Sequence, residues 1–180
     1  MKGEGISQSP VYGAGVMELV TVAVEYCAFV ERSSEWSRLD FSDKVTKLLA
    51  LLYVKAATAP KYEMLSEYCY LEDFVTEDNY DAVRRGVSAV MGDRDDYLDV
   101  FMEDMKYSDS PILTTVSENL ADIYQELKNF VLRYKNAADE EMAMDSLAEM
   151  KEGFECGWGQ KMVNVLRALH EVRYSEQDEY

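Results

Sequence analysis

The chain has 180 residues, 48% of them hydrophobic, and a formal net charge of −17 at pH 7. This length suits a single domain, and the hydrophobic content excludes a wholly disordered chain. So acidic a surface repels phosphates and anionic lipid, which argues against nucleic acid and membranes as partners and favours a protein with basic features.

The three cysteines, Cys27, Cys69 and Cys156, are far apart and form no Cys-x-x-Cys pair. This pattern is typical of a reducing compartment and argues against both a disulfide framework and a zinc site. The N-terminus lacks the apolar core of a signal peptide, and the longest apolar run, residues 48–54, is too short to cross a bilayer. The sequence therefore predicts a cytoplasmic protein without a cofactor.

Residues 1–10 read as a flexible leader, and residues 11–32 form the first predicted helix. Apolar side chains recur there at helical spacing and also fill other faces of the helix. A helix that is apolar nearly all round is expected at the centre of a fold or at a subunit contact.

The next two helices carry clearer start and stop signals. Asp40 is the predicted N-cap of a helix that runs over residues 41–58 and is ended by Pro60. Thr76 caps a third helix, because acidic residues follow it in the first turn, and Gly92 suits the position just past the end.

Two further helices are predicted in the middle of the chain. An acid-rich helix covers residues 94–106, and a strongly amphipathic one covers residues 112–134. Ser110 is the expected N-cap of the second, with Pro111 at its first position, where the missing N–H costs nothing.

The last predicted element begins near Asp139 and keeps one helical phase through Gly157 and Gly159. It is expected to be one long helix or two nearly collinear helices, kinked at these glycines. Gly153 and Gly157 suit the close approach of another helix, and the alternative is a ligand-lined kink at residues 157–159.

Six or seven amphipathic helices with short connections, and no hairpin signal, predict an all-α fold. We expect a single-domain helical bundle over residues 11–174, followed by an acidic tail at residues 175–180.

Six stretches of the chain also carry a family resemblance: EYCAF (25–29), DDYLDVF (95–101), EDMKYSD (103–109), ADIYQ (121–125), WGQK (158–161) and LRALHEVRY (166–174). With them the chain resembles a family of small, uncharacterised bacterial proteins, domain of unknown function 5063. The resemblance implies a stand-alone helical protein and brings no catalytic residues with it.

The acid-rich region offers one enzymatic hypothesis. Asp95, Asp99 and Glu103 stand four residues apart, and Glu126 lies near the core edge of the next predicted helix. Such carboxylates could hold Mg²⁺ or Mn²⁺ in a hydrolase of the all-α nucleotide pyrophosphohydrolase type. Helical phase turns Asp99 and Glu103 outward, away from the second acid row, so a solvated acidic face is the favoured interpretation.

Residues 60–75 show no clean period and are predicted to form an ordered loop with several aromatic side chains. Tyr62, Tyr68, Tyr70 and Phe74 could bind a partner or cover the protein's own bundle, and both interpretations stay open. The favoured function is a non-catalytic protein-interaction module with an acidic, tyrosine-rich surface. No catalytic residue is assigned, and a homodimer is kept open.

Overall fold

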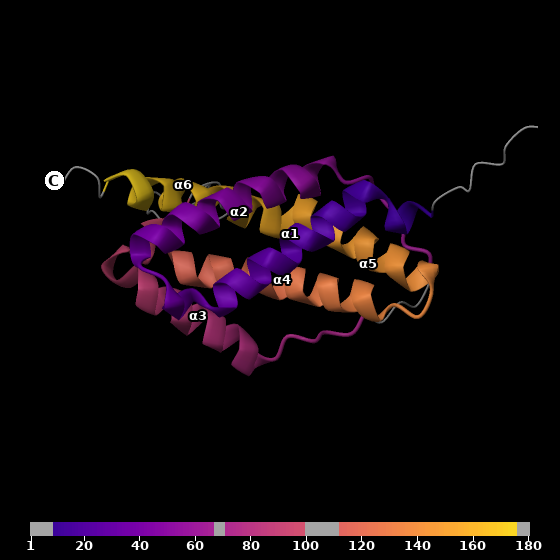
Figure 1. The fold of residues 1–180 in the computed structure, drawn as a ribbon, viewed down its shortest axis with the longest axis horizontal. Coiled ribbons are helices and arrows are strands. Elements are labelled where there is room, and N and C mark those ends of the chain that lie inside the picture. The colour runs from indigo at the N-terminus through magenta and orange to yellow at the C-terminus, as the bar shows by residue number, and fades with distance from the viewer. Residues whose placement is uncertain (1–8, 67–70, 100–111, 176–180) are drawn as a thin grey trace, which may run out of the picture.

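The structure, a computed structural model, describes residues 9–66, 71–99 and 112–175. Its helices lie mostly lengthwise in an elongated bundle (Figure 1). Within the described residues the α-helices are α1 (Ala14–Glu31), α2 (Arg38–Thr58), α3 (Glu77–Met91), α4 (Val116–Asn136), α5 (Glu140–Gly153) and α6 (Gly159–Ser175). The shorter elements are the 3-10 turns Pro10–Tyr12, Ser33–Glu35 and Gly92–Arg94, the strands β1 (Asp96–Leu98) and β2 (Leu113–Thr115), and a π-helical turn, termed the π segment (Phe154–Trp158).

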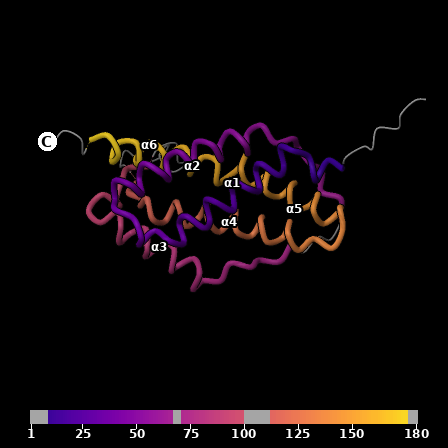
Figure 2. Tube along the Cα trace, in the orientation of Figure 1, coloured from indigo at the N-terminus to yellow at the C-terminus, as the bar shows by residue number. Residues whose placement is uncertain are grey.

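Helix α4 occupies the centre of the bundle. It packs against α1, α3, α5 and α6, while α2 packs against α1 and α6. Its inward face carries Leu120, Ile123 and Leu127, all fully buried. The tube view shows the same arrangement, with α4 crossing the middle of the molecule (Figure 2). The all-α prediction is confirmed, and the core is the apolar stripe of this helix with the faces packed on it.

The first two helices begin at different residues from those predicted. Helix α1 starts at Ala14, after the 3-10 turn, although the sequence suggested a start near residue 11. Helix α2 starts at Arg38, and the prediction of Asp40 as its N-cap is wrong. Ser37 is the N-cap, because its Oγ accepts a hydrogen bond from the Asp40 backbone N–H at 3.2 Å.

Helix α3 has the predicted boundaries. The Oγ1 of Thr76 accepts from the backbone N–H of Asn79 at 3.2 Å, and the Asn79 side chain accepts from the Thr76 backbone in return. The helix ends at Gly92, whose φ of 56° lies in the left-handed region that favours glycine.

Residues 96–98 form a strand, so the helix predicted over residues 94–106 is wrong at this point; residues 100–111 lie outside the described residues. Strand β1 pairs with β2 in antiparallel fashion, with Asp96 opposite Thr115 and Leu98 opposite Leu113. The next helix therefore begins at Val116, later than predicted, and Thr115 is its N-cap. Ser110 and Pro111, the predicted start, also fall outside the described residues.

The C-terminal element follows the prediction of two nearly collinear helices. Helices α5 and α6 continue one another along the back of the bundle, joined by the π segment (Figure 1). Gly159 follows the π segment, and only a residue without a Cβ fits at this position, because a Cβ there would lie 2.4 Å from the Phe154 carbonyl oxygen. This tight contact lies between neighbouring turns of the same helix. The predicted close approach of another helix at Gly157 is wrong, because a Cβ there would meet no atom within 4 Å.

None of the helices in residues 9–66, 71–99 and 112–175 combines the length and the apolar character that crossing a bilayer requires.

Candidate functional site

Asp95, the first of the predicted metal-binding acids, binds the first turn of helix α4 beside its N-cap, Thr115. Its side chain is buried, Oδ1 accepts from the Ser117 backbone N–H at 2.8 Å, and Oδ2 accepts from the Ser117 hydroxyl at 2.7 Å. The first amides of a helix have no partner within the helix and favour negative charge nearby. This carboxylate therefore anchors the start of α4.

Asp99, the second acid, is also buried, and its Oδ1 accepts a hydrogen bond from the side-chain amide of Asn164. Glu103 lies outside the described residues. Glu126 lies on α4, about three turns beyond the helix start that Asp95 binds. Among the residues that the structure describes, no three His, Cys, Asp or Glu side chains form a group that could hold a metal ion.

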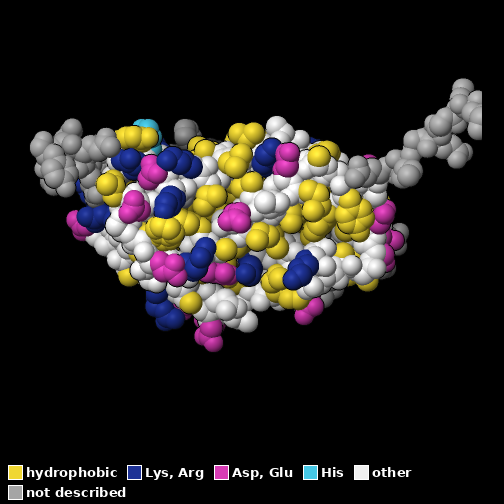
Figure 3. All heavy atoms as spheres, in the orientation of Figure 1, with side chains coloured by type: hydrophobic (Ala, Val, Ile, Leu, Met, Phe, Trp, Pro, Cys, Tyr) yellow, Lys and Arg dark blue, Asp and Glu magenta, His cyan; other side chains and the backbone are white. Residues whose placement is uncertain are grey.

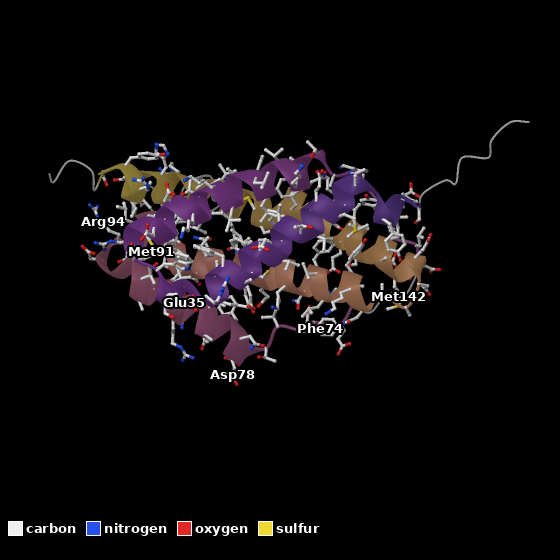
Figure 4. All side chains as sticks on the ribbon, viewed as in Figure 1. Glu35, Phe74, Asp78, Met91, Arg94 and Met142 are labelled. Carbon is white, nitrogen blue, oxygen red and sulfur yellow. The ribbon has the colours of Figure 1, made fainter. Side chains whose placement is uncertain are left out.

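The predicted aromatic cluster is described only in part, since Tyr68 and Tyr70 lie outside the described residues. Tyr62 is half-buried and packs against the core, which raises the pKa of its hydroxyl. Phe74 is half-buried too, on the chain that runs towards the end of the molecule where Met142 stands (Figure 4). Each of these two side chains is partly covered and partly accessible. Each therefore fits both interpretations, covering the bundle and binding a partner.

The irregular chain around them is held in place by side chains from two helices. We define the pinned segment as residues 60–66 and 71–75. The carboxylate of Asp145, on α5, has no exposed surface; it accepts from the Leu65 backbone N–H at 2.6 Å and from the Ser66 hydroxyl. A buried charge is tolerated only when it is hydrogen-bonded, so the segment and Asp145 stabilise each other.

Helix α4 fixes the second half of the pinned segment. The Asn129 Oδ1 accepts from the backbone N–H groups of Phe74 at 2.8 Å and Val75 at 3.0 Å. Arg133 donates from Nε to the Glu72 carbonyl oxygen at 2.8 Å. No sequence motif marks these residues, because α4 and α5 supply them separately.

A cavity of about 330 Å³ lies between α4 and the joined helices α5 and α6. Its lining residues come from α4, the end of α5, the π segment and the start of α6: Asp122, Gln125, Glu126, Gly153, Cys156, Gly157, Trp158 and Lys161. This is the site of the predicted ligand-lined kink. The two glycines were detectable from the sequence, whereas their partners on α4 were not.

The two carboxylates of the cavity differ in their surroundings. Asp122 accepts from the Tyr80 hydroxyl at 2.8 Å and forms an ion pair with Lys161. Glu126 makes no hydrogen bond or ion pair with any described residue. Partial burial raises its pKa, and the negative charge of Glu149 raises it further.

The cysteines have different environments. Cys27 is buried in the core, as expected, and burial raises the pKa of its thiol to about 12. Cys156 is exposed in the lining of the cavity. Cys69 lies outside the described residues.

Helical bundles of this kind are a fold class that hosts many functions. The model of the family described as domain of unknown function (DUF5063) matches residues 11–175, and the chain belongs to this family. Its fold is similar to the crystal structure of protein BF1032 from Bacteroides fragilis, a structural genomics target, with a TM-score of 0.80 and 39% sequence identity. The match covers 93% of this chain and 97% of that one. A comparison with curated proteins gave no match.

Proposed function

We propose that this protein is a non-catalytic protein-binding module and that the pinned segment is its contact surface. One observation carries this proposal. The fold uses a fully buried carboxylate, Asp145, to hold the backbone of an irregular segment whose large apolar side chains stay outside. Met64 is 45% exposed and Leu65 is 53% exposed.

Pinning favours binding because it removes an entropic cost. A loop that becomes ordered only on binding gives up part of the interaction free energy, whereas a loop ordered during folding does not. Asp145, Asn129 and Arg133 hold backbone groups and leave the apolar side chains accessible. The segment is therefore displayed in one conformation, as a contact surface requires.

The charges around the pinned segment indicate the chemistry of the partner. Glu63, Glu72 and Asp73 are exposed within it, and the chain has a net charge of −17. Apolar side chains among acids fit a protein that presents apolar residues within a basic surface. The metal-dependent hydrolase has weaker support, because the carboxylates of Asp95 and Asp99 already accept hydrogen bonds.

Photo-crosslinking from position 65 tests the proposal. Leu65 is replaced by a photoreactive phenylalanine derivative, and the same derivative at Ala89, an exposed position on α3, is the control. We expect a discrete adduct from position 65, in cells that produce the protein, that position 89 does not give. Equal adducts from both positions, or none from position 65, would contradict a contact surface there.

The mass of the adduct also separates a foreign partner from a second copy of the chain. Hydrophobic side chains gather in patches on the face drawn in Figure 3. Among the exposed apolar residues are Met17 and Val24 of α1 and Val54 of α2. Residues 1–60 carry 6 basic and 7 acidic side chains, so copies repel least there. A crosslinked homodimer that is lost in Val24→Glu but kept in Glu25→Gln would place the contact on α1. The partner would then be a second copy of this chain and not a different protein.

The pinning itself can be measured by amide hydrogen exchange. Asp145→Ala leaves the Leu65 N–H without its buried acceptor, at a cost of about 1–3 kcal/mol. We expect faster exchange of the Leu65 amide while the central amides of α4 stay protected. Glu140→Ala, at an exposed residue of the same helix, is the control and should leave Leu65 unchanged. Slow exchange at Leu65 in both variants would show that Asp145 does not hold the segment.

A further inference from the structure

The indole N–H of Trp158 faces the cavity beside the π segment and has no acceptor among the described residues. Trp158 is only 3% exposed, and its indole N–H makes no hydrogen bond with any described residue. A Cβ at Gly153 would lie 3.2 Å from the indole Nε1 and 3.8 Å from Glu126 Oε2. The indole N–H, the glycine and the carboxylate therefore face one space. An N–H group that faces such a space can donate to a bound molecule that carries an acceptor.

The same space holds a carboxylate that forms no ion pair with a described residue. Asp122 is satisfied by Tyr80 and Lys161, but Glu126 has no hydrogen-bonding or ionic partner among the described residues. Its neighbour Glu149 disfavours the ionised form, and Arg133 and Lys161 offset this only in part. A bound cation would compensate this charge.

We propose that this cavity binds a small organic cation that also carries an oxygen acceptor. Its ammonium or guanidinium group pairs with the Glu126 carboxylate, and its oxygen accepts from the Trp158 indole N–H. The volume of about 330 Å³ lies at the lower end of the range for ligand sites. A metal ion fits less well, because an N–H donor repels it. The net charge of −17 also concentrates organic cations at the surface.

The helix geometry explains why the cavity exists. A π-helical turn adds a residue to the helix, and such turns are frequent at functional sites. Here it places Trp158 opposite α4, and Gly153 leaves open the space that a side chain would fill. Gly153→Leu should therefore fill the site without removing any group that holds the ligand.

Nuclear magnetic resonance reads the proposed contact directly, because the chain has two tryptophans and hence two indole N–H signals. The probe is L-argininamide, which carries a guanidinium group and a carboxamide oxygen. We expect a saturable shift of the Trp158 indole signal at millimolar probe or below, with the Trp36 signal unchanged. Agmatine, which lacks the carboxamide, should bind more weakly and move the Trp158 signal less.

Three variants separate the proposed site from general attraction between a cation and an acidic protein. Glu126→Gln should weaken argininamide binding at least tenfold, and so should Gly153→Leu. Glu25→Gln, which removes one exposed charge on α1, should bind like the unmodified protein. The proposal is overturned by the absence of a saturable Trp158 shift, by equal affinities of Glu126→Gln and Glu25→Gln, or by an equal shift with succinate.

Discussion

At the scale of single residues, the glycines around the π segment have different surroundings. A Cβ at Gly159 would lie 2.4 Å from the Phe154 carbonyl oxygen and 3.0 Å from its ring. A Cβ at Gly157 would meet no atom within 4 Å. Packing therefore requires a residue without a side chain at Gly159 but not at Gly157.

Alanine substitutions at these two glycines should therefore have opposite effects. Gly159→Ala forces the backbone of the π segment to move, and we expect a loss of about 1–3 kcal/mol in the free energy of unfolding. Gly157→Ala removes only the conformational freedom of glycine in the unfolded chain, and we expect a gain of about 0.5–1 kcal/mol. Urea denaturation measures both. Equal effects would show that the π segment is absent in solution.

Glu126 should lower the stability of the protein at neutral pH. Its pKa is raised in the folded state, so its contribution favours the fold at pH values below its ordinary pKa of 4.5 and is lost as the pH rises through the raised value. We expect Glu126→Gln to stabilise the protein at pH 7 by on the order of a few tenths of a kcal/mol, because solvent screens the charge. The gain should disappear below pH 4. Thermal denaturation at both pH values measures it, and a destabilised variant at pH 7 would reveal a partner for Glu126 in the fold.

At the scale of elements, the junction between β1 and α4 depends on burial that alternates along the chain. Asp95, Tyr97 and Asp99 face inward to different extents, whereas Asp96 and Leu98 are exposed. This is the two-residue period of a strand. The expectation that the acids form a solvated helical row is wrong for Asp95 and Asp99, because an extended chain turns both towards the interior.

Two adjacent aspartates provide a matched test of this junction. Asp95→Ala removes the acceptor of the Ser117 N–H and hydroxyl at the start of α4, and we expect a loss of about 1–3 kcal/mol in the free energy of unfolding. Asp96→Ala changes an exposed residue and should cost less than about 0.5 kcal/mol. Urea denaturation of both variants measures the difference. Similar values would mean that Asp95 does not stabilise the start of α4.

At the scale of the whole molecule, the effect of divalent cations on the melting temperature distinguishes the proposed binding module from the alternative, a metal-dependent hydrolase. The carboxylates of Asp95 and Asp99 are engaged in hydrogen bonds, so we expect millimolar Mn²⁺ to shift the melting temperature no more than sodium chloride of equal ionic strength. A metal-binding protein would gain about 2.7 kcal/mol at one hundred times the dissociation constant. An Mn²⁺-dependent rise that is lost in the double variant Asp99→Asn, Glu103→Gln would favour the hydrolase.

Local signals in the sequence were sufficient for much of the fold. The capping box at Thr76, the left-handed Gly92 and the continuous phase on both sides of the π segment each depend on residues close together in the chain. They correctly placed α3 and the long C-terminal element. The start of α2 was missed by three residues, because Ser37 and Asp40 are both good N-cap residues and only the backbone conformation distinguishes them.

The candidate sites were predictable only in part, because their residues come from different elements. The glycines and Trp158 suggested a ligand-lined kink, but Glu126 was singled out for a metal and not for the space that it shares with Trp158. No pattern of residue spacing in the sequence marks Asp145, Asn129 and Arg133. Their roles appear only when α4 and α5 lie beside residues that precede them by more than fifty positions.

The sequence by itself determined the fold class and the acidic charge of this protein, because helical periodicity, caps and composition are local or additive properties. Only the tertiary structure decided that Asp95 and Asp99 are buried, that residues 60–66 and 71–75 are pinned, and that Trp158 and Glu126 share a cavity. The physical reason is that burial and hydrogen bonding depend on which elements meet. The sequence does not distinguish an aspartate that is buried and accepts two hydrogen bonds from an aspartate that is exposed to water.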